Sequence, residues 1–504
     1  MNGPRLHIAL FGALLLLPLQ QSSGEVNWAA VHELTVRGLD RLYNLEINRS
    51  IATFDTVCVM APGDPRGYFF RSMAHFLLYS LNREQKEFDI FLEQSDTVVT
   101  VCEGILDNNE NDATAHFYLG GILGYRGLGY QANGSILKAV NDGRKGVSHL
   151  EEAIRQDPKL YDAYMGFGLF RYLIAKIPKS LRWILNIIGF EGDLEGGLKA
   201  LKVASEKGMY CRTEASFFLA QFLFSEHRYD EAFTYLNPLI EKYPRNTLFL
   251  VSYASWQSRL NKNDEALRAA TRALELNEQN NVRYGEQFAF STIGNIYYAR
   301  NDFANAAKYL ASYVQIDKTN RQNWSYYRLG VAREMTGDRQ GALEAYRNMT
   351  GNDASDRPND AYLYRQGIDR IRRPMNEADA LLIRASNESA LGSTDSARAH
   401  YDQALQKSGG DDDLQARALY GIQQILFNKK EYADVVALSP RLLALKPLTE
   451  RWIIPHGYFQ LGQAYARLGN PEEARKAFRM VGTFDNYDFQ SRLEEHVDEE
   501  MKNL

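Results

Sequence analysis

A helical hairpin near the C-terminus constrains the fold more than any other stretch of the chain. Residues 455–478 read PHGYFQLGQAYARLGNPEEARKAF, in which two amphipathic helices flank a turn at Gly469-Asn470. Pro471 suits the first position of the second helix. The apolar faces carry Leu461, Gly462 and Tyr465 in the first helix and Ala474 and Phe478 in the second. Helices about 8–10 Å apart need small residues where their backbones approach, so the hairpin is predicted to pack closely.

The same arrangement recurs along most of the chain. Equivalents of Leu461-Gly462 occur at residues 119–120, 167–168, 219–220, 253–254, 293–294, 329–330, 384–385 and 420–421. In the second helix, Ala232 and Ala266 are 34 residues apart, which is the period of the tetratricopeptide repeat (TPR). The pattern resembles this repeat. The resemblance implies an all-α fold, a TPR-type α–α superhelix of about eleven helical pairs with helical insertions, whose concave face is built mainly from first helices.

The strength of the repeat pattern divides the mature chain into segments. Residues 25–110 are predicted to form TPR-like helical pairs, and residues 111–350 a central array with an insertion at 172–192. The glycine-rich stretch 120–134 either lengthens a first helix or ends it with a loop. A second insertion, 351–377, carries a basic cluster, and residues 378–504 form a C-terminal array. No stretch alternates apolar and polar residues long enough to predict a sheet.

The first 24 residues are typical of a signal peptide. Arg5 precedes an apolar stretch, Leu6–Leu19, and small residues follow up to Gly24, after which we expect cleavage. The apolar stretch is short of the ~20 residues that a membrane helix needs, and an uncleaved anchor is the alternative. The protein is therefore predicted to be exported, either periplasmic or secreted. Its three cysteines are interpreted as buried small hydrophobic residues.

One stretch is more distinctive than the repeats. Residues 166–198 read GFGLFRYLIAKIPKSLRWILNIIGFEGDLEGGL. This stretch resembles the inclusion-body clearance family of outer-membrane and cytosolic TPR proteins, and exported bacterial TPR proteins share it. The shared positions are Gly166, Leu169, Phe170, Pro178, Gly189, Phe190, Gly192, Asp193, Gly197 and Leu198. The resemblance implies an all-helical scaffold and no catalytic residue.

The residues that carry common enzyme chemistry lack the necessary spacing. His32-Glu33 begins a zinc-type motif, but Val36 takes the place of its second histidine. The glycines at 124, 127 and 129 are not followed by the Lys-Ser/Thr of a phosphate loop. None of the nine histidines pairs at metal-ligand spacing. We therefore predict no catalytic residue, no metal and no cofactor, and the net charge of −5 argues against nucleic-acid binding.

The predicted binding surface is the groove lined by the first helices. In TPR helices, positions two before, two after and five after the Leu of Leu-Gly tend to face inward. The candidates near these positions are Phe217, Gln221, Asn295, Tyr298, Arg300, Trp324, Tyr327 and Gln463. Aromatic, amide and guanidinium groups suit peptide or glycan binding, although such residues also pack between helices. The leading hypothesis is a non-enzymatic scaffold that binds a protein or peptide partner in the cell envelope or secretory space. A glycan-binding helical protein is an alternative.

The insertion at 173–190 suggests a further alternative. A helix beginning at Pro178 would place Leu181, Ile184 and Ile188 on one face, with Trp183 as an interfacial anchor. Together with nearby lysines and arginines, this pattern is typical of a helix on a membrane surface. The same pattern also fits a helix that packs onto the rest of the protein. A peripheral, lipid-associated protein therefore remains an alternative function.

Overall fold

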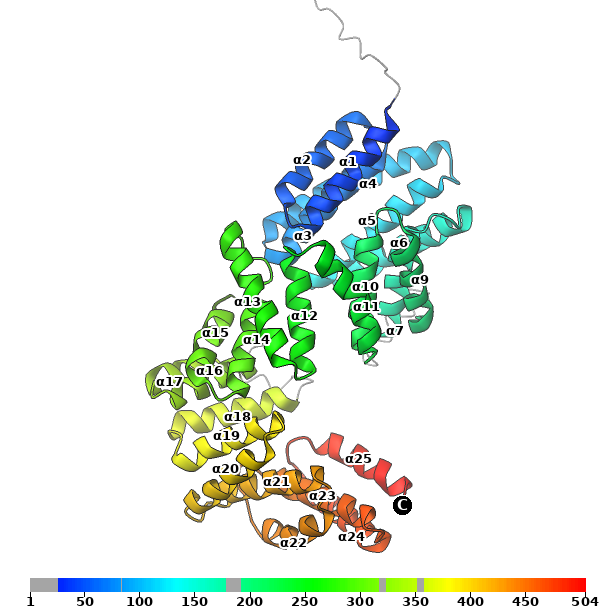
Figure 1. Cartoon of the computed structure of the whole chain (residues 1–504). Coiled ribbons are helices and arrows are strands. Elements are labelled where there is room, and N and C mark those ends of the chain that lie inside the picture. Colours follow the sequence, from blue (N-terminus) through cyan, green and yellow to red (C-terminus); the bar gives the residue numbers. More distant parts are fainter. Residues whose placement is uncertain (1–25, 83, 178–191, 317–322, 351–357) are drawn as a thin grey trace, which may run out of the picture. The chain divides into compact units, whose positions relative to one another are not determined.

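The computed structural model describes residues 26–82, 84–177, 192–316, 323–350 and 358–504. In these residues the chain forms 24 α-helices and no strand (Figure 1). The predicted all-α fold of TPR-type helical pairs is thereby confirmed. The chain divides into two compact units, which we describe separately: unit 1 extends to Leu219, and unit 2 begins at Ala220.

Unit 1 contains the first helical pairs. Its helices are α1 (Trp28–Tyr43), α2 (Ile47–Met60), α3 (Pro65–Asn82), α4 (Gln85–Asn108), α5 (Ala113–Ala132), α6 (Ile136–Gln156), α7 (Ala163–Ala175), α9 (Leu194–Lys207) and the start of α10 (Arg212–Ser225). Consecutive helices pack as pairs: α1 with α2, α3 with α4, α5 with α6, and α7 with α9. The glycine-rich stretch 120–134 lengthens α5 rather than ending it with a loop.

Unit 2 contains the clearest repeats. Its helices are α11 (Tyr229–Lys242), α12 (Thr247–Arg259), α13 (Asn263–Asn280), α14 (Glu286–Ala299), α15 (Phe303–Ile316), α16 (Asn323–Met335), α17 (Arg339–Arg347), α18 (Pro358–Arg372), α19 (Glu377–Ala390), α20 (Thr394–Lys407), α21 (Asp412–Asn428), α22 (Tyr432–Leu443), α23 (Ile453–Arg467), α24 (Pro471–Val481) and α25 (Gln490–Lys502). Among these, α18 and α25 stand outside the series of pairs.

Each hairpin turn in unit 2 follows the same rule. In each turn, a residue that follows the first helix adopts a left-handed conformation, which ends the helix. These residues are His227, Asn261, Asn301, Gly337, Gly392, Lys430 and Gly469. Five residues later, a fully buried small residue packs in the second helix, at Ala232, Ala266, Ala306, Ala342, Ala397, Val435 and Ala474. The fixed spacing sets the register in which successive hairpins stack.

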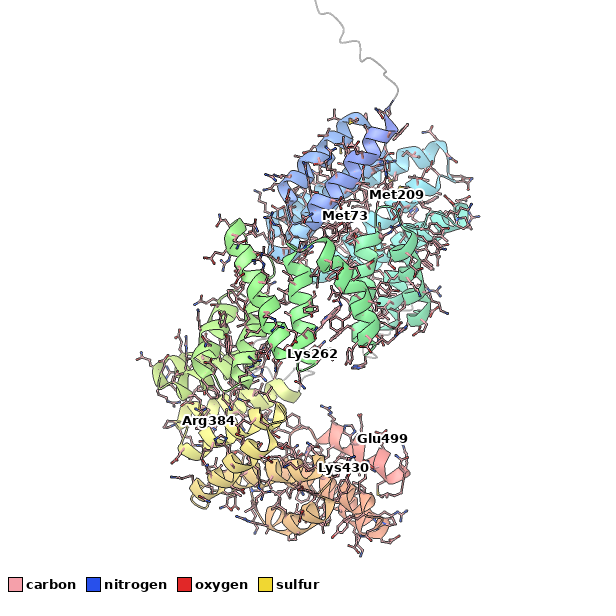
Figure 2. All side chains as sticks on the ribbon, viewed as in Figure 1. Met73, Met209, Lys262, Arg384, Lys430 and Glu499 are labelled. Atoms are coloured by element: carbon pink, nitrogen blue, oxygen red, sulfur yellow. The ribbon has the colours of Figure 1, made fainter. Side chains whose placement is uncertain are left out.

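The small residue of the Leu-Gly pair has the packing role that the sequence predicts. A Cβ atom added to Gly462 would lie 2.6 Å from the ring of Phe478, and one added to Gly294 would lie 2.9 Å from Leu310. Contacts between hairpins use larger side chains. The guanidinium of Arg384 on α19, labelled in Figure 2, lies over the Phe303 ring of α15 at 5.2 Å. Within these two hairpins, the glycine of the first helix thus contacts a large side chain of the second helix.

Several predicted features fall outside the described residues. They are the signal peptide at 1–24, the insertion residues Pro178, Leu181, Trp183, Ile184 and Ile188, and the start of the insertion 351–377. The described part of that second insertion contains α18. No described helix is both long and apolar enough to cross a membrane. Cys58, Cys102 and Cys211 are buried free thiols.

Candidate functional site

Three of the predicted groove residues meet around one arginine in unit 2. Arg328 on α16 donates a hydrogen bond to Asn295 Oδ1 on α14. Its guanidinium carbon lies 5.2 Å from the ring centre of Tyr298 and 5.6 Å from that of Trp324. Tyr327, the preceding residue, is half-buried. Neighbouring first helices thus combine two aromatic rings and an amide around a cation.

Arg328 lacks a counter-charge within the described part of the chain. No described carboxylate lies at ion-pair distance from it, and its recorded hydrogen bond uses one of its five N–H donors. Burial lowers the pKa of Arg328, while Tyr298 acts in the opposite sense. A guanidinium nevertheless remains protonated in proteins, so the site holds a partly buried positive charge.

Tyr298 itself packs between helices. Its side chain is only 8% exposed, and its ring contacts Phe303 edge-on at 5.7 Å. Its main-chain carbonyl accepts a hydrogen bond from Asn387 Nδ2 at 2.8 Å, which ties α14 to α19. The partly exposed surface here is therefore provided by Trp324, Tyr327 and Arg328, which are all half-buried.

The remaining predicted groove residues do not join this group. Arg300 pairs with Asp264 of α13 at 2.7 Å and is exposed. Gln463 donates to Glu500 on α25 at 2.6 Å. Gln221 is half-buried on α10, and Phe217 belongs to unit 1. These residues were selected by their positions relative to the Leu-Gly pairs, but each has a different environment in the structure.

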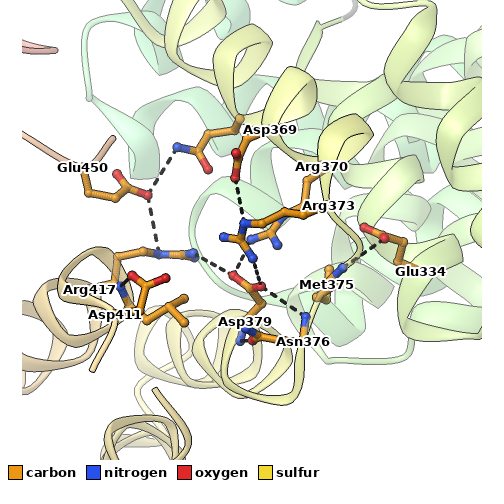
Figure 3. A network of polar contacts seen from close by, with 12 residues as sticks. Glu334, Asp369, Arg370, Arg373, Met375, Asn376, Asp379, Asp411, Arg417 and Glu450 are labelled. Atoms are coloured by element: carbon orange, nitrogen blue, oxygen red, sulfur yellow. Dashed lines mark hydrogen bonds and ion pairs between the residues drawn. The ribbon is translucent and has the colours of Figure 1, made fainter. Parts of the chain in front are cut away.

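A polar network of unit 2 is organised by one buried carboxylate (Figure 3). Asp379, in the first turn of α19, accepts hydrogen bonds from Arg370 at 2.6 Å and Arg373 at 2.7 Å. It also forms a capping box with Asn376. Burial opposes ionisation of Asp379, but the hydrogen bonds and charges of the two arginines outweigh it and hold its pKa well below the usual range.

The network continues from α19 to α21 and the loop before α23. Arg417 on α21 lies 3.7 Å from a carboxylate oxygen of Asp379 and 3.7 Å from one of Glu450. Glu450 also accepts hydrogen bonds from Tyr362 at 3.0 Å and Trp452 at 2.7 Å. These contacts connect α18, α19 and α21 with the loop before α23.

The ion pairs of this region balance in charge. Four guanidinium groups pair with four carboxylates, namely Arg339, Arg370, Arg373 and Arg417 with Glu334, Asp369, Asp379 and Glu450. Arg328 takes no part in them. Arg370 is 1% exposed, and its Nε and Nη1 atoms have no hydrogen-bond partner among the described residues. We define the Tyr–Arg cluster as Tyr298, Tyr327, Arg328, Arg370 and Arg417.

The members of the Tyr–Arg cluster influence one another electrostatically. Burial raises the pKa of Tyr298, and Tyr327 raises it further. The charges of Arg328, Arg417 and Arg370 act in the opposite direction. Groups from four helices, α14, α16, α18 and α21, therefore act on the same region. Of these arginines, Arg370 and Arg417 already pair with carboxylates, whereas Arg328 has no such pair among the described residues.

Sequence reasoning did not identify Arg328, Asp379 and Arg417. A signal was available for Arg328, because it directly follows a predicted inward residue on a first helix. Arg370 belongs to the basic cluster of the insertion 351–377 but is buried rather than exposed. Among the described residues, no group of three or more His, Cys, Asp or Glu side chains could hold a metal ion.

Unit 1 contains a second unusual group, a buried carboxyl on α10. The hydroxyl of Tyr125 on α5 donates a hydrogen bond to Glu214 Oε1, and Oε2 has no partner among the described residues. Burial raises the pKa of Glu214 to about 7, although the hydrogen bond from Tyr125 lowers it. Glu214 therefore binds its proton more tightly in the folded state than in the unfolded state.

We expect this carboxyl to make the stability of unit 1 depend on pH. The folded state binds more protons than the unfolded state between pH 4.5 and about 7, so stability falls as pH rises through this window. At about 1.4 kcal/mol per pKa unit, the loss is at most roughly 3 kcal/mol. Urea unfolding across this range should show this slope in the wild type and a smaller one in Glu214→Gln. Equal slopes in the two proteins would contradict the assignment.

The helical pairs and their aromatic and polar first-helix residues define a helical repeat protein. Residues 162–351 match the family model Iml2/Tetratricopeptide repeat protein 39, and residues 455–479 match a tetratricopeptide repeat model. The chain is therefore a TPR-containing protein, and repeats of this type are typical of protein-interaction scaffolds. Among curated proteins, none matches the chain.

Solved structures of low sequence identity align with most of the chain at low TM-scores. A human IFIT1 dimer with PPP-AAAA is 14% identical, with 90% of this chain and 93% of that chain covered and a TM-score of 0.33. Yeast Tom70 is 11% identical, with 89% and 99% covered and a TM-score of 0.30. The TPR domain of P58(IPK) is 13% identical, with 81% and 94% covered and a TM-score of 0.21.

Proposed function

We propose that the protein is an exported, non-enzymatic TPR scaffold that binds an acidic peptide segment of a partner protein at the Tyr–Arg cluster of unit 2. The observation that supports this proposal is Arg328, a partly buried guanidinium between Tyr298 and Trp324 that has no described carboxylate partner. A carboxylate from the partner supplies the missing counter-charge.

The chemistry of the cluster suits a carboxylate better than a neutral ligand. A guanidinium can hold a carboxylate through two parallel hydrogen bonds, and these charge-assisted bonds are stronger than neutral ones. Asn295 fixes the orientation of Arg328 from one side. The half-buried rings of Trp324 and Tyr327 offer apolar surface for neighbouring side chains of the peptide.

Peptide selection tests this function. Peptides selected from a random display library on the intact protein should be enriched in Asp, Glu or a free C-terminus. Their affinity should fall about tenfold in Tyr327→Ala. Arg300→Gln is the matched control, because Arg300 lies nearby in sequence but pairs with Asp264. Selected peptides without acidic groups, or equal losses in both variants, would refute the proposal.

The alternative functions considered from the sequence predict different binding results. A labelled oligonucleotide should not bind, consistent with the net charge of −5. Binding on a glycan array, or flotation with anionic vesicles without any peptide selection, would favour the glycan or membrane alternative. These outcomes would overturn the peptide proposal.

Export is part of the proposal and rests on residues 1–24. N-terminal sequencing of the protein from the cell envelope or the secreted fraction should begin at Glu25. Recovery of a protein that begins at Met1 in the cytosol would contradict export.

A further inference from the structure

Two histidines face each other across the open end of the hairpin of unit 1, where α5 begins and α6 ends (Figure 1). The Nδ1 atoms of His116 on α5 and His149 on α6 lie 2.9 Å apart, and the ring centres are 5.1 Å apart. The other ring nitrogen of His116, Nε2, lies 2.9 Å from the main-chain carbonyl oxygen of Glu110, in the loop before α5. One chain of hydrogen bonds therefore links the loop, α5 and α6.

The geometry limits the number of protons that this pair of histidines can hold. A carbonyl oxygen only accepts, so Nε2 of His116 carries a hydrogen and donates it. The hydrogen bond between the two Nδ1 atoms needs one hydrogen, which either ring can supply. The bonds are therefore complete when both rings are neutral and also when one ring is charged. When both rings are charged, two N–H groups point at each other and the bond between the rings is lost.

The pair of histidines lies between two other contacts of the same hairpin. About one helical turn away, a Cβ added to Gly120 would lie 2.7 Å from the carbonyl oxygen of Gly146, so the two backbones touch there. Toward the open end, Gln156 of α6 donates a hydrogen bond at 2.8 Å to Asn111 of the loop. Because the helices cannot approach more closely at the glycines, repulsion between the histidines acts on the open end.

The surroundings of the histidines disfavour a second proton. Burial lowers the pKa of His149, and the charges of His116 and Lys145 lower it further, whereas Glu152 acts in the opposite sense. Glu152 already pairs with Arg155. Among the described residues, α3, α4 and α7, which also pack against this hairpin, add no charged group to this effect. Below about pH 6.5 the folded state therefore binds fewer protons at His149 than the unfolded state, and stability is lost as pH falls.

We propose that His116 and His149 form a pH-sensitive switch, which holds the open end of the α5–α6 hairpin together while at most one of the two rings is charged. Uptake of the second proton breaks the bond between the rings and separates α6 from the start of α5 and from loop 109–112. The hydrogen bond between Gln156 and Asn111 alone then ties that loop to α6 by side chains among the described residues. The switch lies in unit 1 and is independent of the peptide site proposed in unit 2.

An NMR titration of the intact protein with ¹³C-labelled histidines tests the coupling between the rings. The signals of His116 and His149, assigned with His116→Gln and His149→Gln, should each change in two steps, because coupled groups titrate in two macroscopic steps. His75 is the internal control, since its Nδ1 lies 2.9 Å from the carboxylate of Glu87 rather than from a second histidine. Its signal should change in one step. Independent single-step titration of His116 and His149 would overturn the proposal.

Hydrogen exchange tests the opening of the hairpin. The amides of residues 109–116, after correction for the intrinsic effect of pH, should exchange about tenfold faster at about pH 5 than at about pH 7.5 in the wild type. His149→Gln should abolish this difference, and the matched variant His75→Gln should retain it. A local readout is needed because Glu214 changes the overall stability of unit 1 in the opposite sense. The same pH dependence in the wild type and His149→Gln would overturn the proposal.

Discussion

Replacement of Asp379 by alanine is expected to lower the free energy of unfolding of unit 2 by about 3–5 kcal/mol. Removal of one partner of a buried ion pair leaves an uncompensated charge, which accounts for a loss of this size. The side chain of Asp379 is 0% exposed, and that of Arg370, its partner, is 1% exposed. The substitution also removes the capping box with Asn376 at the start of α19, which adds to the loss.

The control is a neighbouring carboxylate with a similar but exposed ion pair. Asp369 lies 3.3 Å from Arg373, and both side chains are more than 30% exposed. Asp369→Ala should therefore cost no more than about 1 kcal/mol. Urea unfolding, followed by helical circular dichroism, measures both effects. Similar losses in the two variants would show that Asp379 is not the centre of the network.

Gly168→Val is expected to destabilise unit 1 strongly, with a loss of about 3 kcal/mol or more in the free energy of unfolding. A Cβ added to Gly168 on α7 would lie 2.7 Å from the carbonyl oxygen of Gly197 and 2.9 Å from the backbone nitrogen of Leu201 on α9. Backbone atoms cannot rotate away as a flexible side chain can. The two helices would therefore have to move apart, and their shared apolar contacts would weaken.

The comparison for this variant is Gly104→Val, on α4. A Cβ there meets no atom within 4 Å, so the stability should change by less than about 1 kcal/mol. Thermal unfolding of the two variants and the wild type gives the comparison. A wild-type melting temperature in Gly168→Val would contradict the close approach of α7 and α9.

The repeat architecture was predictable because its determinants are local. Gly469 ends a helix, Ala474 is buried five residues later, and Gly462 accommodates Phe478. All three constraints lie within one hairpin, so the sequence of that hairpin is sufficient to reveal them. The same reasoning applies to the other copies.

The Tyr–Arg cluster was less predictable because it depends on contacts between distant hairpins. Asn387 and Tyr298 are 89 residues apart, and their hydrogen bond connects α14 to α19. No local pattern encodes this approach, and it leaves Tyr298 almost fully buried. Likewise, Asp379 gains its role from arginines on α18 and α21. Arg300, which the sequence pattern also placed in the groove, pairs with Asp264 instead and does not join the cluster.

Unit 1 contains a cavity of about 380 Å³ lined by α5, α6 and α7, and its glycines are a third case in which sequence and structure can be compared. The glycines of α5 were visible in the sequence, but a helical glycine can serve either close packing or open space. Gly120 serves the first purpose and Gly124 the second, and only the position of α6 and α7 distinguishes them. Composition alone could not separate these two roles.

The central claim is that Arg328 binds a carboxylate of the partner. The most direct measurement is a calorimetric titration of a selected peptide against wild type and Arg328→Gln, with its acidic residues either intact or replaced by their amides. The account predicts that amidation weakens binding to the wild type about tenfold and that it has little effect on binding to Arg328→Gln. Equal effects of amidation on the two proteins would contradict the account.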